Sequence, residues 1–505
     1  MSTPAGVPKS EWSLPTRPGL QIEDDNEYAG AANAAPVLYV EEAEHYVEGL
    51  REFSIEEIGS SRWFDQHQRL AKLNLQAHQS AMARSDEYVL EALLTFDKLG
   101  VVVHELLAIE AWKEFVLPAL LETERAKSGK CTMRLYFTLY HEATLVNLLK
   151  IAMFHEHICE QAGDLLIELA DYCARKMTLL ISGRASSRPR SPVSGTAREV
   201  AKNIEERISK LTPTEEIGGY QEETEFRVCV TAVALLRFLC EHLHRLPLGV
   251  ITRVLDTHDV LLGLVILVEN PPWTRRTEEG KWQKFVDFEW RNVAVADLLQ
   301  ITKTEGQVWL AMYHLLCEEE CRKRYHFNSL RKNSILRVRK YLNDVLLDQL
   351  PVLAAVQRYM DELTIMEVPE PPSMGTTGSL LMEQVAKVRQ SLTRGHDWKD
   401  IAFKATASTG GAFCTHDDAT DPDVKSVAAL FAEGEHEVWN GSHLDGPDAA
   451  AKGPAGTPSA AALATVEAVR ASKTKVVVET AADGVGSIGG EGRSEEEAPA
   501  SSVRM

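Results

Sequence analysis

The sequence lacks long hydrophobic runs and an evident secretory leader. Its longest strongly apolar run covers residues 260–268, between Asp259 and Glu269, and is far shorter than the roughly 20 residues that a membrane-spanning helix needs. We therefore expect a buried helix there and no membrane span. Residues 1–30 are rich in Pro, Glu and Asp and have no apolar core flanked by basic residues, which is unlike a signal peptide. We expect a protein that is not secreted.

Positive charge is also scarce. Among 505 residues, the 74 Asp and Glu outnumber the 54 Lys and Arg, and the formal net charge is -20. Proteins that bind nucleic acids need clustered cations to neutralise phosphates, so we expect no nucleic-acid partner. The acidic balance selects no protein partner by itself, and solubility is its simplest explanation.

Closely spaced cysteine pairs are absent as well. The eight cysteines are scattered along the chain, which favours reduced thiols in the cytosol over a disulfide framework. Three groups have a spacing that invites a metal or redox interpretation: His155-x-His157-x-Cys159, Cys240-x-His242-x-His244 and Cys317-x-x-x-Cys321.

None of these three groups is predicted to bind a metal. Side chains two residues apart on a helix point in nearly opposite directions, so only the outer members of each triplet share a face. Two ligands are too few for a structural zinc site. Cys317 and Cys321 share a helix face, but the three glutamates between them would raise the thiol pKa. We predict structural or solvated roles for all of them and no metal ligand.

The sequence contains fragments of catalytic and cofactor-binding motifs, but none of these motifs is complete. Residues 141–142 and 155–156 (HE) begin like the HExxH motif of metalloproteases, but the second histidine is missing from both. Residues 484–489 (GVGSIG) mimic a dinucleotide-binding turn, yet the helix and second strand that this motif requires do not follow. We predict that the protein is not an enzyme and has no catalytic residue and no cofactor.

Helical periodicity is what the sequence does contain. Apolar residues recur every three or four positions in several segments, with hardly any alternating strand pattern. The stripes include Leu145, Leu148, Leu149, Ala152 and Met153; Leu166, Leu169, Ala170, Cys173, Met177 and Leu180; Cys229, Ala232, Val233, Leu236, Cys240 and Leu243; and Ile335, Val338, Leu342, Val345 and Leu346. Such stripes indicate helices packed on helices. We predict an all-α protein, either an armadillo/HEAT-like α-solenoid or an irregular helical array, with disordered termini.

Composition divides the chain further. We expect a disordered N-terminus at residues 1–36, an N-terminal helical half at 37–182, a flexible Ser/Arg/Pro loop at 183–197, a C-terminal helical half at 198–404 and a low-complexity acidic tail at 405–505. One continuous helix is expected over residues 380–404.

Two places are candidates for binding. Trp273, Arg275 and Arg276 follow two prolines on an expected turn between helices, and these residue types are enriched at interface hot spots. The alternative interpretation is that Trp273 is buried and the arginines are solvated. Arg331, Lys332, Arg337, Arg339 and Lys340 form a basic stretch, which is interpreted as a solvated helix face or as a receiver for the acidic tail.

Several short ungapped segments of the sequence resemble segments of one known family and follow in the same order along the chain. They are HEATLVNLL from His141, DYCARKMTLL from Asp171, ENPPWTRR from Glu269, GQVWLAMYHLL from Gly306 and YLNDVLLDQLP from Tyr341. With the shorter words between them, they resemble the zinc finger MYND domain-containing protein 10 family over about residues 37–404.

The resemblance implies a non-enzymatic cytoplasmic scaffold and co-chaperone for the preassembly of axonemal dynein arms, needed for the motility of cilia or flagella. Its clients would be dynein heavy chains. Its partners would be a leucine-rich-repeat dynein assembly protein, a chaperone of the heat-shock-ninety type and a prolyl-isomerase co-chaperone, and its place in the cytoplasm would extend to the basal body or centriolar region.

The sequence departs from the family where the zinc finger would be. After Lys404 it offers Cys414, His416, His436 and His443, and no cysteine pair, so no zinc ligand can be carried over. Without the finger, the resemblance implies that the leucine-rich-repeat partner docks on a helical surface instead. A generic armadillo-like adaptor in signalling or transport remains the alternative function, and an enzyme with an unrecognised helical site is a second rival.

Overall fold

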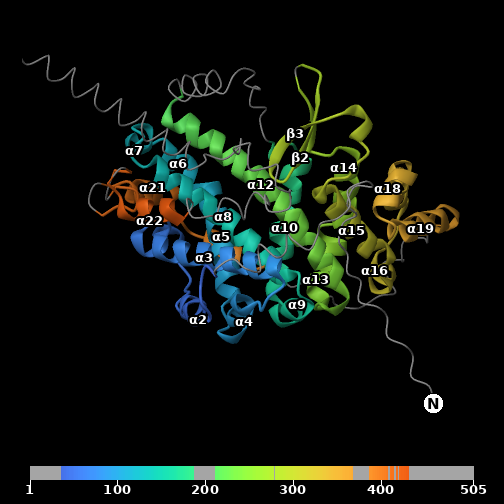
Figure 1. Cartoon of the computed structure of the whole chain (residues 1–505), viewed down its shortest axis with the longest axis horizontal. Coiled ribbons are helices and arrows are strands. Elements are labelled where there is room, and N and C mark those ends of the chain that lie inside the picture. The colour runs from blue at the N-terminus through green and yellow to red at the C-terminus, as the bar shows by residue number, and fades with distance from the viewer. Residues whose placement is uncertain are drawn as a thin grey trace, which may run out of the picture. The chain divides into compact units, whose positions relative to one another are not determined.

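The computed structural model describes residues 36–186, 211–277, 279–367, 386–407, 410–414, 417–418 and 420–430. Helices dominate these residues (Figure 1), and the all-α prediction is confirmed. None of the helices in the described ranges combines the length and the apolar character that crossing a bilayer requires. The expected disordered N-terminus, most of the expected loop at 183–197 and the chain after residue 430 lie outside the described residues.

The helices before residue 187 build the first part of the fold. They are α2 (Val40–Glu48), α3 (Ser61–Ala83), α4 (Tyr88–Thr95), α5 (Leu99–Ala111), a π-helical turn η2 (Trp112–Val116), α6 (Leu117–Leu121), α7 (Glu124–Lys127), α8 (Thr132–Met153), α9 (Glu156–Ala162) and α10 (Leu165–Ile181).

The elements after residue 210 complete it. They are α12 (Pro213–His242), α13 (Leu248–Thr252), the π-helical turn η4 (Arg253–Thr257), α14 (Val260–Glu269), β1 (Thr274–Arg276), β2 (Trp282–Val286), β3 (Glu289–Val293), α15 (Lys303–Cys317), α16 (Glu319–Arg324), α17 (Ser329–Val338), α18 (Asp344–Gln349), α19 (Leu353–Ile365), α20 (Val388–Thr393), α21 (Trp398–Ala405) and α22 (Pro422–Leu430).

The core is centred on α8, α10 and α12. Helix α8 is buried on nearly all sides, so the stripe around Leu148 is part of a wholly enclosed helix rather than one apolar face. The 30-residue α12 begins with a capping box between Thr212 and Glu215 and with Pro213 in its first turn. It packs along both α8 and α10. The two helical halves expected from the sequence therefore share one core.

Two local breaks between helices have a positive backbone φ angle. Gly163, with φ +53°, separates α9 from α10, a backbone conformation that glycine adopts easily. Asp259, with φ +44°, separates η4 from α14. Another expected stripe is interrupted, because α17 ends at Val338 and α18 begins at Asp344. Val345, which we placed on that stripe, is 37% exposed.

A small antiparallel sheet corrects the expectation of hardly any strands. Its order is β1-β2-β3, and β2 and β3 are joined at Asp287 and Phe288, both with positive φ, as in a type I′ hairpin. The pattern was hard to recognise because Lys284, in the middle of β2, is buried. Its Nζ lies 3.0 Å from Glu305 Oε2 and donates to the backbone oxygen of Gln300.

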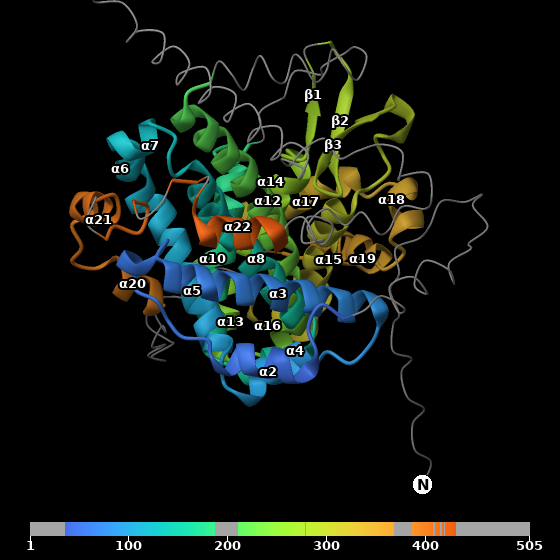
Figure 2. The ribbon, with the colours of Figure 1, turned by 60° about the vertical axis from the view of Figure 1, so that its left-hand side comes forward.

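The C-terminal elements differ most from the expectation. The single helix expected over residues 380–404 is instead two short helices, α20 and α21, with Gly395 at φ +82° between them. Residues 410–430, which we assigned to the low-complexity tail, include α22 and the buried Phe413. In Figure 2, α20, α21 and α22 lie beside the N-terminal helices, and α22 runs along α3.

This return of the chain decides between the two expected architectures. In a solenoid each repeat contacts only its neighbours. Here α20 packs on α5, α21 on α6, and α22 on α3 and α8. The described residues therefore form an irregular helical array.

Candidate partner-binding site

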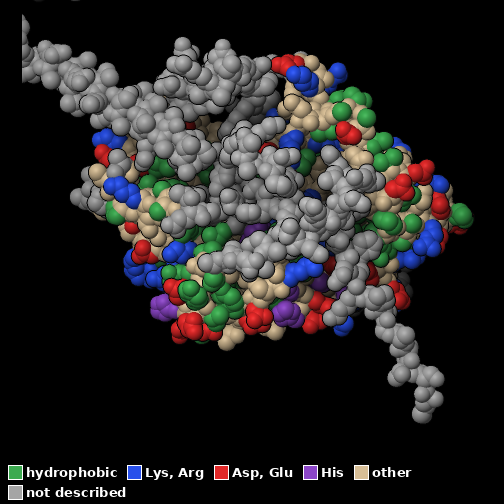
Figure 3. Space-filling view, viewed as in Figure 1, with side chains coloured by type: hydrophobic (Ala, Val, Ile, Leu, Met, Phe, Trp, Pro, Cys, Tyr) green, Lys and Arg blue, Asp and Glu red, His purple; other side chains and the backbone are tan. Residues whose placement is uncertain are grey.

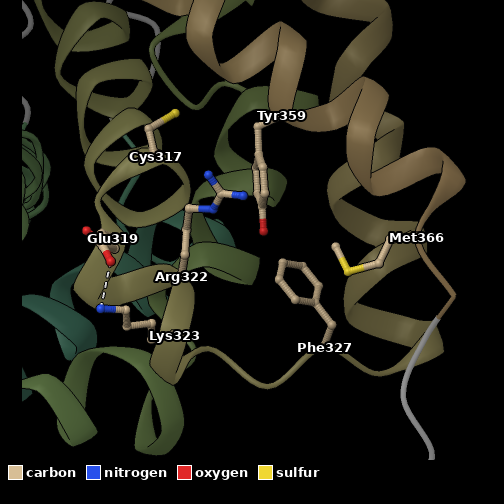
Figure 4. Close-up of a pocket in the computed structure, with 7 residues that line it drawn as sticks. All are labelled: Cys317, Glu319, Arg322, Lys323, Phe327, Tyr359 and Met366. Carbon is tan, nitrogen blue, oxygen red and sulfur yellow. Dashed lines mark ion pairs between the residues drawn. The ribbon is translucent and has the colours of Figure 1, made fainter.

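A surface groove lies between α15, α16 and α19 and has a volume of about 610 Å³. Figure 4 shows Tyr359, Phe327 and Met366 facing one another across it, with Arg322 beside the tyrosine ring. Its lining residues are Cys317, Glu319, Arg322, Lys323, Phe327, Tyr359 and Met366.

Hydrogen bonds to Asp259 and the short helix α16 hold the groove in place. Asp259 accepts hydrogen bonds from the Tyr325 hydroxyl at 2.8 Å and from Arg331 Nε at 2.7 Å. These bonds hold the loop after α16 against the turn before α14, and Phe327 lies on that loop. Helix α16 has glutamates in its first turn and Arg322 and Lys323 in its last, which matches the helix dipole.

Aromatic and cationic groups pair within the groove. Arg322 Cζ lies 4.2 Å from the centroid of the Tyr359 ring, a cation-π geometry. Phe327 and Tyr359 have ring centroids 6.5 Å apart. Beside them, Met366 is 40% exposed and Ile365 is 85% exposed. Tyr, Arg and Met are the residue types that interfaces favour, so this groove has the chemistry of a protein-binding surface.

The thiols near the groove are unsuited to redox chemistry. Burial raises the pKa of Cys317 to about 11 and that of Cys321 to about 12, so both stay protonated at neutral pH. The sequence placed them on one helix face, but α15 ends at Cys317 and α16 begins at Glu319. In the described ranges, no three His, Cys, Asp or Glu side chains come together in a way that could hold a metal ion.

The three residues predicted to bind a partner lie on the small sheet. Trp273 is 1% exposed, so its ring is not available to a partner. Arg275 Cζ lies 3.8 Å from the centroid of the Trp290 ring, and Arg276 Nε donates to the backbone oxygen of Gly280. The structure places the two arginines together on β1. It buries the tryptophan, so the three side chains do not form one exposed surface.

The predicted basic stretch is largely paired within the fold. Arg331 contacts Asp259, Arg337 binds Glu269 at 3.0 Å, and Arg339 binds Asp361 at 2.6 Å. Lys332 Nζ donates to the backbone oxygens of residues 364 and 366. On the face seen in Figure 3, basic and acidic side chains are interspersed over the described surface. Carboxylates of the described residues therefore pair with Arg331, Arg337 and Arg339, and the expected acidic tail lies outside the described residues.

A buried ionic cluster was missed by sequence reasoning. Lys113 and Lys176 come from η2 and α10, and both contact Glu142 of α8 and Glu225 of α12. The Tyr172 hydroxyl donates to Glu142 at 2.9 Å. Burial acts to raise the pKa of Glu225, but the two ammonium groups outweigh it and the pKa of Glu225 is lowered. Each ammonium has carboxylate partners, so the cluster serves to hold the helices together.

The described residues define a class: an irregular all-α protein with a surface groove suited to protein binding. The chain is 29% identical over 357 residues to the zinc finger MYND domain-containing protein 10 homolog of Drosophila melanogaster. The similarity covers 71% of this chain and 74% of the relative. This similarity agrees with the resemblance to the zinc finger MYND domain-containing protein 10 family that the sequence carries. No family model matches it, and no solved structure matches it either.

Proposed function

We propose that the protein is a non-enzymatic scaffold in the preassembly of axonemal dynein arms and is needed for ciliary or flagellar motility. The observation that carries this proposal is the similarity over 357 residues to a member of the zinc finger MYND domain-containing protein 10 family. We further propose a co-chaperone role in the cytoplasm, near the basal body or centriolar region. Its clients are dynein heavy chains, and its partners are a heat-shock-ninety-type chaperone, a prolyl-isomerase co-chaperone and a leucine-rich-repeat assembly protein.

The groove at Tyr359 is proposed to bind one of these partners. Its exposed methionine, aromatic rings and guanidinium group support a protein ligand rather than a small polar substrate. A binding surface of this kind lets a scaffold act by stabilising particular conformers of its partners, because any ligand that prefers one state shifts the population toward it.

The function is tested by deleting the protein in a flagellated cell. We expect axonemal microtubules to remain while dynein arms are lost, because large unassembled heavy chains are prone to misfolding and degradation. Motility and cytoplasmic heavy-chain abundance should fall together, and the wild-type gene should restore both. Normal heavy-chain levels and assembled arms in the deletion would refute the proposal and favour the generic adaptor.

The groove is tested by rescue of the same deletion. The double variant Arg322→Ala/Met366→Ala removes two exposed side chains that line the groove, and we expect it to fold but to restore fewer arms. The matched control is Arg339→Ala, which removes an exposed ion pair with Asp361 outside the groove. Equal rescue by both variants would show that the groove is not the partner site.

A further inference from the structure

The described residues between 410 and 430, here called the C-terminal strap, occupy an aromatic pocket on the N-terminal helices. The ring of Phe413 is 1% exposed and stacks with Trp112 at a centroid distance of 5.8 Å. Gly59, with φ +86°, forms the floor: a Cβ there would lie 2.4 Å from Phe413 Cζ. Only glycine leaves room for the ring at this position.

Next to this pocket lies a buried arginine that binds strap carboxylates. Arg134, at the start of α8, is 2% exposed. Its Nη1 lies 3.3 Å from Asp421 Oδ2, and its Nη2 lies 2.5 Å from Asp423 Oδ2. Its Nε donates to the backbone oxygen of Ala412 at 3.2 Å. Arg134 therefore binds both the backbone and the acidic side chains of the strap.

Two further contacts extend this recognition. Arg125 Nη1 lies 2.9 Å from Asp417 Oδ1, and Arg125 Nε donates to the Phe413 backbone oxygen at 3.1 Å. Asp418 accepts from the backbone N–H groups of Met133 and Arg134 at 2.9 and 3.4 Å. These N–H groups belong to the first turn of α8, where a carboxylate is favoured.

The surface beneath the strap would therefore require a new ligand if the strap left it. A buried guanidinium without a carboxylate is costly, and Trp112 would lose the ring that stacks on it. The strap itself contributes few large apolar side chains, namely Phe413, Val424, Val427 and Leu430. Its other contacts with the N-terminal helices are ion pairs and hydrogen bonds.

From this arrangement we infer that the surface formed by Gly59, Trp112, Arg125, Arg134 and the first turn of α8 is a docking site for an acidic, aromatic-anchored segment of a partner protein. The strap occupies the site in cis. The matching ligand carries an aromatic residue followed by aspartates or glutamates within the next ten residues, as Phe413 is followed by Asp417, Asp418, Asp421 and Asp423. Binding of the partner displaces the strap. This site shares no residue with the groove at Tyr359, and the inference does not rest on the proposed function.

The test uses the full chain and a labelled synthetic peptide with the sequence of residues 410–430, which carries the ligand chemistry in trans. Fluorescence anisotropy compares the wild type with an opened variant, Phe413→Ala/Asp423→Asn, whose own strap is weakened. A tethered strap competes at a high effective concentration, so we expect the opened variant to bind the peptide at least about tenfold more tightly. Adding Arg134→Gln to the opened variant should abolish this gain, and a peptide with the same two substitutions should not bind.

Hydrogen exchange on the wild type tests the inference without any variant. An exchangeable strap opens locally, so its amides should exchange faster than those in the middle of α8. Exchange of the strap only with global unfolding would overturn the inference, as would equal peptide binding by the wild type and the opened variant. A dimer of the opened variant in sedimentation would also overturn it, since the occupant would then be the strap of a second copy.

Discussion

The buried Lys176 and the partly buried Glu225, which is 17% exposed, form an ion pair in which Nζ lies 2.7 Å from Oε1. The pair joins α10 to α12, the helices on either side of residues 187–210. Glu142 of α8 lies 2.8 Å from the same ammonium group, and Lys113 of η2 contacts both carboxylates. Four segments of the N-terminal and central core are therefore fixed in register by one cluster of charges.

Removal of one charge from this cluster should be strongly destabilising. Glu225→Gln leaves Lys113 and Lys176 to share Glu142, with Glu110 3.8 Å from Lys176, and breaking a buried pair in this way typically costs about 3–5 kcal/mol. Urea unfolding at pH 7 measures the change. The control is Glu91→Gln, an exposed glutamate on α4, which should change the free energy of unfolding by less than about 0.5 kcal/mol. Similar values for the two variants would show that the cluster adds no stability.

The enclosed helix α8 predicts a large effect of core truncation. Leu148 is fully buried, so Leu148→Ala should lower the free energy of unfolding by about 2–5 kcal/mol through lost burial and a residual cavity. Leu299→Ala is the matched control, because Leu299 is 55% exposed and its truncation should stay within about 0.5 kcal/mol. A loss below about 1 kcal/mol for Leu148→Ala would mean that the core around α8 can collapse to fill the space.

His314 should make the protein less stable in acid. Burial, followed by the nearby Arg237, His242 and His244, lowers the pKa of His314 to about 3. The folded state then binds fewer protons than the unfolded state below about pH 6.5, so the free energy of unfolding falls as the pH drops from there toward 3. Between pH 7 and 5.5 this one residue should contribute a loss of about 1 kcal/mol.

The variant His314→Gln isolates that contribution. It keeps a polar side chain on α15 but cannot titrate, so its free energy of unfolding should fall less than that of the wild type between pH 7 and 5.5. Denaturant unfolding at the two pH values gives the comparison. An identical fall in both proteins would contradict the lowered pKa of His314.

Chelation should leave the folded protein unchanged. The cysteines are placed singly, and the described His, Cys, Asp and Glu side chains form no cluster of three around a common point, whereas a structural zinc site needs four ligands. We expect the same melting temperature with and without EDTA, and less than one zinc per chain by elemental analysis. Stoichiometric zinc whose removal unfolds the protein would reveal a site that we have missed.

The sequence pointed to one of the two candidate binding surfaces and missed the other. Trp273, Arg275 and Arg276 stood out because of their residue types, yet Trp273 is buried. The groove was not recognised, because Arg322, Phe327, Tyr359 and Met366 are separated by up to 44 residues and follow no motif. Only the packing of α16 and α19 beside α15 brings them together.

The sequence alone determined the helical class, the buried apolar helix after Asp259 and the family resemblance. These features depend on local spacing, backbone preference and the order of residues, all of which can be read without contacts. The tertiary structure decided which charged side chains are buried and where residues 410–430 pack. Charged residues such as Lys176, Glu225 and Arg134 are ordinarily expected on solvated helix surfaces. Their burial becomes favourable only when partners from distant segments supply the opposite charge.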